Sequence, residues 1–173
     1  ILSVHPFSSS LESNCIFAEY KRRFDDFIGL YQKHFYAAAV LGADVVVIHG
    51  SVAKQKRDLS DEFYFDRFQK LIDLGKREGV RVCQENVVRF RSENVEFLKK
   101  MRSALGDDFN MVFDVKQAIR SGYDPFYVLN EFKNDIVHMH LSDNTHEVDC
   151  MPPGRGTFDF RRLFDVMDSV DYK

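Results

Sequence analysis

Short apolar runs alternate with longer segments of helical periodicity along this chain, and that alternation constrains the fold more than any other feature. Five runs have the length and composition of strands, at residues 1–5, 44–49, 80–85, 110–114 and 135–140. Apolar residues recur at helical spacing over 17–42, 61–78, 92–105 and 158–170, with mixed helix and turn over 115–133. Strands that alternate with helices form βαβ units, in which the strands are parallel. The sequence therefore predicts an α/β fold.

Two parallel architectures compete, an open doubly wound sheet and a (β/α)8 TIM barrel. No strand is followed by a G-x-G-x-x-G turn, which removes the usual argument for dinucleotide binding. Each predicted strand instead ends on a polar residue: His5, His49, Glu85, Asp114 and His140. Barrel enzymes carry their chemistry at these carboxyl ends, so the pattern favours the barrel. Five strands are too few to close it, so either elements are missing at both ends or the barrel interpretation is wrong.

Three of these strand ends form the core of a predicted metal site. Side chains alternate along a strand, so each shares a face with the residue two positions earlier: Glu85 with Cys83, Asp114 with Val112, His140 with His138. If that face is the barrel interior, the three groups converge at one mouth. Two carboxylates and an imidazole suit Mn²⁺, Co²⁺, Zn²⁺ or Mg²⁺. A carboxylate after a strand is more often a helix cap or turn former, and for Asp114 taken singly that alternative stays open.

The remaining polar candidates are open to more than one interpretation. His5 and His49 are either structural histidines, donors to substrate oxygens, or ligands of a second ion. Gly50 and Ser51 would let the backbone approach an anionic group closely. Arg155, in the turn PPGRG at 152–156, either clamps a phosphate or a sugar hydroxyl or is simply solvated. Three further histidines are interpreted as structural or surface residues: His34, His138 and His146.

Composition narrows the range of partners. The 173 residues carry a net charge of −3 with a pI of about 6.1, unlike the basic surface of a nucleic-acid binder. No apolar run approaches the roughly 18 residues of a membrane span, and we expect no signal peptide. The three cysteines, Cys15, Cys83 and Cys150, are far apart, which is typical of reduced thiols in a cytoplasmic protein. The first residue is not Met, so we expect a piece of a longer protein.

Four motifs resemble the xylose-isomerase-like TIM-barrel superfamily: QENV around Glu85, FDVKQA around Asp114, HMHLSD around His140, and PPGRGTFDF. This superfamily includes sugar and sugar-phosphate isomerases and epimerases and the endonuclease IV type of DNA-repair enzyme. The resemblance covers nearly the whole chain and implies one incomplete barrel domain over residues 1–173, with strands three to seven present. It also implies two strands before Ile1, and beyond Lys173 a last strand with a further glutamate ligand.

Departures from the endonuclease pattern favour an isomerase or epimerase. Gln117 stands where that branch has a histidine in D-x-x-H, and Val148 and Cys150 stand where it has D-x-H. A single-metal site needs only Glu, Asp, His and the distal Glu. A metal-dependent phosphodiesterase and a non-catalytic sugar-binding barrel remain the alternatives, and we expect no nucleic-acid partner.

The resemblance also implies a mechanism. A divalent ion held by Glu85, Asp114 and His140 would polarise a ketose carbonyl and stabilise an enediolate. Glu85 would be one of two acid/base residues. The substrate, a sugar or sugar phosphate, would contact the surrounding polar side chains: His5, His49, Gln117, Asp143 and Arg155. Neither membrane association nor a particular oligomeric state is indicated, and a homo-oligomer stays open.

Overall fold

The computed structural model describes residues 1–54 and 59–172. Five strands form one sheet in the order β1-β2-β3-β4-β5, and every neighbouring pair is parallel. Their bounds are β1 Ser3–Val4, β2 Val45–Ile48, β3 Arg81–Glu85, β4 Met111–Asp114 and β5 Ile136–His140. Each strand is the spatial neighbour of the next strand in sequence, which is the order of a TIM barrel. The predicted α/β class and the incomplete barrel are confirmed.

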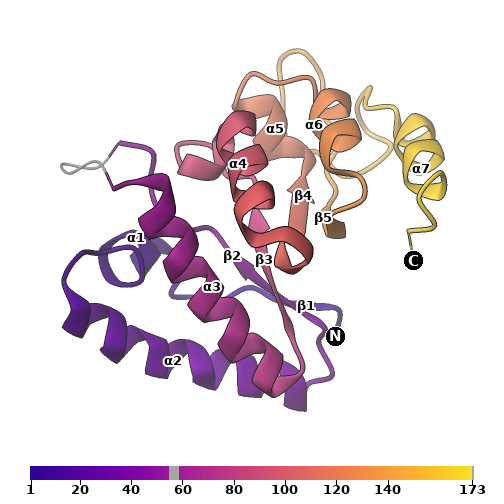
Figure 1. The fold of residues 1–173 in the computed structure, drawn as a ribbon. Helices are drawn as coiled ribbons and strands as arrows, with labels where there is room; N and C mark the ends of the chain where they lie inside the picture. Colours follow the sequence, from indigo (N-terminus) through magenta and orange to yellow (C-terminus); the bar gives the residue numbers. More distant parts are fainter. Residues whose placement is uncertain (55–58, 173) are drawn as a thin grey trace.

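Helices connect the strands and cover the outer side of the sheet (Figure 1). The crossover from β1 to β2 contains α1 Glu12–Cys15 and α2 Lys21–Val40, and later crossovers contain α3 Asp61–Glu78, α4 Val95–Leu105, α5 Val115–Arg120 and α6 Pro125–Phe132. Helix α7 Phe160–Asp168 follows β5. Short 3₁₀ turns lie at Ser9–Leu11, Arg91–Glu93 and Gly106–Asp108.

The sheet is strongly curled. Strands β1 and β5 are its two edges, and in a flat sheet four strand spacings would separate them by about 19 Å. Yet Ser3 Oγ of β1 lies 3.1 Å from His138 Nε2 of β5. The two edges therefore approach each other across the inner face, as in a half-barrel.

The two faces of the sheet have different environments because side chains alternate along each strand. Outward-pointing residues such as Val46, Ile48 and Phe113 join the main core beneath the helices. Four inward-pointing residues form a separate small cluster: Val45, Val47, Cys83 and Val112. The polar strand ends continue this inner face, one layer above the apolar cluster.

Several predicted elements begin later than predicted. The predicted helix 17–42 begins only at Lys21, because Phe17 turns into the core and stacks on Tyr64 at 4.1 Å between ring centroids. The predicted helix 92–105 begins at Val95, because Asn94 caps it by accepting from the Phe97 amide. The first strand is limited to Ser3–Val4.

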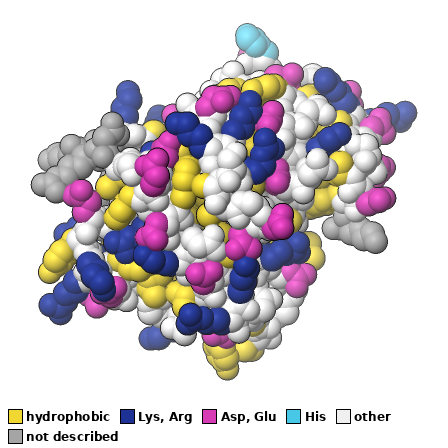
Figure 2. Space-filling view, viewed as in Figure 1, with side chains coloured by type: hydrophobic (Ala, Val, Ile, Leu, Met, Phe, Trp, Pro, Cys, Tyr) yellow, Lys and Arg dark blue, Asp and Glu magenta, His cyan; other side chains and the backbone are white. Residues whose placement is uncertain are grey.

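The surface carries charges of both signs. Figure 2 shows acidic and basic side chains interspersed on one face, with apolar atoms between them. That mixture agrees with the small net charge of −3. Within residues 1–54 and 59–172, no helix has the length and apolarity needed to cross a bilayer.

Candidate functional site

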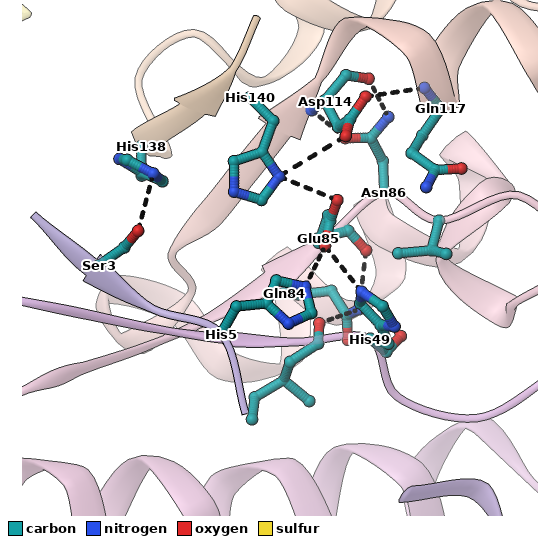
Figure 3. A network of polar contacts seen from close by, with 12 residues as sticks. Ser3, His5, His49, Gln84, Glu85, Asn86, Asp114, Gln117, His138 and His140 are labelled. Carbon is teal, nitrogen blue, oxygen red and sulfur yellow. Dashed lines mark hydrogen bonds and ion pairs between the residues drawn. The ribbon is translucent and has the colours of Figure 1, made fainter. Parts of the chain in front are cut away.

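The five polar strand ends meet around one carboxylate, that of Glu85 (Figure 3). Its Oε1 lies 3.1 Å from His140 Nδ1, and its Oε2 lies 3.1 Å from His49 Nε2 and 3.4 Å from His5 Nε2. The Nδ1 of His140 also lies 3.6 Å from Asp114 Oδ2. Each of the five strands, or the residue directly after it, therefore contributes a side chain, with Glu85 of the central strand in the middle.

The same side chains form two groups with the spacing of metal ligands. One group is Glu85, Asp114 and His140, the other is His5, His49 and Glu85, and within each the ligand atoms lie within 4.8 Å of one another. Among the described residues, Glu85 Oε2 is a buried oxygen that forms no hydrogen bond of regular geometry, although two imidazole nitrogens lie within 3.4 Å of it. Carboxylate oxygens and imidazole nitrogens around such an atom are a donor set that fits a divalent ion.

Electrostatics keep Glu85 ionised although it is only 2% exposed. Burial by itself would raise the pKa of this carboxyl, but the imidazoles of His140, His49 and His5 outweigh burial and hold the pKa below its usual range. The effect is mutual, since Asp114 and Glu85 raise the pKa of His140 to about 9. His140 is therefore a cation between two carboxylates, and a metal ion would compete with its proton.

Asp114 combines the two roles that its sequence position left open. Its Oδ1 accepts from the Gln117 amide at 2.9 Å and so caps helix α5. Its Oδ2 faces His140 and also lies 3.9 Å from Lys116 Nζ. One oxygen is thus committed to the fold, and the other faces the cluster.

The other predicted substrate-binding residues lie outside this cluster. Gln117 Oε1 accepts from the Val88 amide at 3.1 Å, which ties it to the loop after β3. The Asp143 carboxylate is 1% exposed and accepts from four backbone amides, those of Asn144, Gly154, Gly156 and Phe158. Arg155 is exposed on the loop that Asp143 organises. The contacts of Asp143 in the structure therefore hold together the loop after β5.

Several residues at the site were missed by the sequence reasoning. Gln84 and Asn86 flank Glu85 and bind the ends of the neighbouring strands. Lys116 approaches Asp114, and His138 pairs with Ser3 one layer below His140. Strand alternation already placed His138 on the face of His140 and could have placed Ser3 on the inner face as well, but the contacts that Gln84, Asn86 and Lys116 make have no sequence signal.

Comparison with known proteins adds to this geometry. A family model described as Xylose isomerase-like TIM barrel matches residues 2–173. An inosose dehydratase from Serratia proteamaculans is 25% identical over 146 residues, which are 70% of this chain and 49% of that protein. The chain thus spans about half the length of the curated relatives it matches.

Two solved structures share the fold over nearly the whole chain. The apo form of 3-keto-D-glucoside 4-epimerase, YcjR, from E. coli has a TM-score of 0.79 and 16% identity, covering 100% of this chain and 68% of that one. The IOLI protein, solved with a zinc atom, has a TM-score of 0.74 and 15% identity, covering 99% of this chain and 64% of that one. At these identities the likeness concerns the fold alone.

Proposed function

This chain belongs to the xylose isomerase-like TIM-barrel family, and from that premise we propose that it acts in a metal-dependent isomerase or epimerase of a sugar or sugar phosphate. The reaction would move a proton next to a carbonyl, through an enediolate. The observation that carries the proposal is the meeting of Glu85, Asp114 and His140, whose ligand atoms lie within 4.8 Å of one another. The epimerase fold neighbour and the inosose dehydratase relative support a sugar substrate.

Glu85, Asp114 and His140 would hold the ion, which we propose to be Mn²⁺, Co²⁺, Zn²⁺ or Mg²⁺. The mixed oxygen and nitrogen donors support this range, and a fold neighbour solved with a zinc atom agrees with it. An ion bound there would polarise a carbonyl oxygen and stabilise the negative charge that develops on it.

Glu85 is the residue that we propose to carry the proton. Three imidazoles hold the pKa of its carboxyl low, so it is ionised at neutral pH and free of a proton of its own. A low pKa also makes a weak base. We therefore expect the basicity of Glu85 to rise when substrate oxygens engage the imidazoles of His5 and His49.

Substrate hydroxyls would be bound by the exposed polar groups around Glu85. The side chains of His5 and His49 are 39% and 21% exposed, so both can reach a ligand and Glu85 at once. Gln117 and Arg155 are proposed as further contacts. For Asp143, whose oxygens are occupied by backbone amides, we propose the indirect role of holding the loop that presents Arg155. The three free cysteines agree with a cytoplasmic location.

A dehydratase is the second candidate, because the curated relatives are named inosose dehydratase. Dehydration of a keto sugar also begins with proton removal next to a carbonyl. The two reactions differ in the next step, since an epimerase returns the proton and a dehydratase releases a hydroxyl group. The same residues around Glu85 would serve both reactions up to that point.

Proton exchange in D₂O tests the proposal and separates the two candidates. The full-length protein, loaded in turn with Mn²⁺, Co²⁺, Zn²⁺ or Mg²⁺, is incubated with a panel of ketoses, ketose phosphates and inososes, and the products are followed by NMR. Deuterium at the carbon next to the carbonyl with an intact carbon skeleton supports an epimerase or isomerase, and loss of water supports a dehydratase. Absence of both reactions across the panel with every metal would overturn the proposal.

A further inference from the structure

We propose that Gln84 and Asn86 are positioning residues, each of which fixes a different part of the site. Gln84 fixes His49, at the end of β2, relative to Glu85, and Asn86 fixes Asp114, at the end of β4. The inference rests on the proposed function in one respect, because the residues being positioned are those of the proposed metal site. Both side chains are buried, with exposed fractions of 0% for Gln84 and 4% for Asn86. Both belong to β3 or its immediate continuation and bracket Glu85.

Gln84 ties the end of β2 to the end of β3. Its Nε2 lies 3.1 Å from the Ile48 carbonyl oxygen, 3.0 Å from that of His49 and 2.9 Å from that of Glu85. Two of these carbonyls belong to residues whose side chains meet at the site. The backbone positions of His49 and Glu85 are therefore linked through a single amide group, as Figure 3 shows from close by.

A tyrosine and a glycine fix the orientation of that amide. The Tyr64 hydroxyl donates to Gln84 Oε1 at 2.6 Å, so the NH₂ group must face the carbonyls. Tyr64 is fully buried, and a Cβ added at Gly50 would lie 1.9 Å from its hydroxyl oxygen. Gly50 also has φ +88°, which favours glycine, so the turn after His49 is shaped around this pair.

Asn86 makes the equivalent link to β4. Its Nδ2 donates to the Asp114 carbonyl oxygen at 3.0 Å, and its Oδ1 accepts from the Asp114 amide at 2.8 Å. The side-chain amide thus pairs with both backbone groups of Asp114, as a neighbouring strand would do. It fixes the residue whose carboxylate faces His140 and whose backbone starts α5.

These side chains take over where the backbone ladder ends. Pairing between β2 and β3 ends at Ile48 with Gln84, one residue before His49 and Glu85. Pairing between β3 and β4 ends at Glu85 with Val112, two residues before Asp114. Buried backbone groups beyond the ladder need other partners, and side-chain amides supply both donors and acceptors. His49 lies beyond the β2–β3 ladder and Asp114 lies beyond the β3–β4 ladder, so the distance of each from Glu85 depends on Gln84 and Asn86, whereas Asp114 and His140 stay paired in the β4–β5 ladder.

Histidine ring NMR of the metal-free protein tests the two links one at a time. The variants are Gln84→Met and Asn86→Leu, which keep side-chain volume and remove the hydrogen bonds. We expect Gln84→Met to shift the ring nitrogen signals of His49 more than those of His140, and Asn86→Leu to do the reverse. Tyr64→Phe removes only the hydroxyl that orients Gln84 and should reproduce the Gln84→Met pattern at smaller amplitude. It replaces Gln84→Met in the test if that variant does not fold.

Titration with Co²⁺ alone gives a second readout on the same variants. Loss of a residue that orients metal ligands typically weakens metal binding about 10–100-fold. We expect the Co²⁺ affinity of each variant to fall within that range and the visible spectrum of the bound Co²⁺ to change. A simply destabilising substitution would disturb both histidines alike, and that result, or unchanged signals in both variants, would overturn the inference. Failure of the wild type to bind Co²⁺ would instead count against the proposed function, while the separate responses of His49 and His140 would still support the positioning roles.

Discussion

Two buried carboxylates in this molecule, Glu85 at the site and Glu12 at the turn after His49, respond to burial in opposite ways. Glu85 is 2% exposed, and three imidazoles lower its pKa although burial alone would raise it. Glu12 is 0% exposed in α1, where the Tyr31 hydroxyl and the Gly50 amide donate to it. There burial prevails over the hydrogen bonds and raises the pKa of Glu12 to about 8.

The difference lies in the partners rather than in the depth of burial. Neutral donors such as a hydroxyl or an amide stabilise a buried carboxylate less than nearby groups that can become cationic. Glu12 holds the turn at Gly50, directly after His49, as a largely protonated group near neutral pH. The molecule therefore places an ionised carboxylate where chemistry is proposed and a neutral one where the turn needs support.

The largest expected effect comes from removing the charge at the site. Glu85→Gln in the full-length protein should reduce proton exchange at the substrate carbon by about 10²–10⁴-fold, because the proposed base is lost. Metal content should fall as well, since Glu85 belongs to both ligand groups. Deuterium exchange followed by NMR and metal analysis by mass spectrometry measure the two effects.

An exposed glutamate provides the matched control for this change. Glu96 has a side chain that is 71% exposed and pairs with Lys99 on α4, so Glu96→Gln removes the same charge away from the site. This variant should exchange protons at the wild-type rate. Exchange that persists in Glu85→Gln would exclude the base role of Glu85 and leave it as a ligand only.

The contrast between the two glutamates also explains what the sequence could and could not predict. Glu85, Asp114 and His140 each end a predicted strand, and the alternation of side chains along a strand predicts the face of the sheet on which each lies. The role of Gln84 depends on carbonyls 36 and 35 residues earlier in the chain, and that of Asn86 on Asp114, 28 residues later. Glu12 lies in a four-residue helix without a periodic pattern, and its partners Tyr31 and Gly50 are distant in sequence. Such pairings join residues that are distant in the sequence, so they form only in the assembled fold and no local sequence pattern predicts them.

A pH-dependent change of stability is expected from Glu12. Its pKa is about 8 in the folded protein against an ordinary value of 4.5, so folding strengthens proton binding. The resulting stabilisation is complete below pH 4.5 and is lost as the pH rises to 8. Relative to Glu12→Gln, which stays neutral, the free energy of unfolding of the wild type should fall by about 1.4 kcal/mol per pH unit within that window.

Urea unfolding of both proteins at several pH values between 4 and 9 measures this difference. The curves should diverge from about pH 4.5 and become parallel above about pH 8, with Glu12→Gln the more stable protein at the alkaline end. A constant difference across the whole range would mean that Glu12 titrates normally, and the contrast with Glu85 would then disappear.

The smallest expected effect comes from substitutions of Asp114, a third buried carboxylate, which serves both the fold and the site. Asn is as good a helix cap as Asp, so Asp114→Asn should keep the cap on α5, while it weakens Co²⁺ binding by removing a charged ligand. Asp114→Ala removes both functions and should additionally cost about 1 kcal/mol of stability. Urea unfolding and Co²⁺ titration of the two variants separate the roles. Equal Co²⁺ affinity in the wild type and in Asp114→Asn would assign Asp114 to the fold alone and restrict the proposed metal site to the group His5, His49 and Glu85.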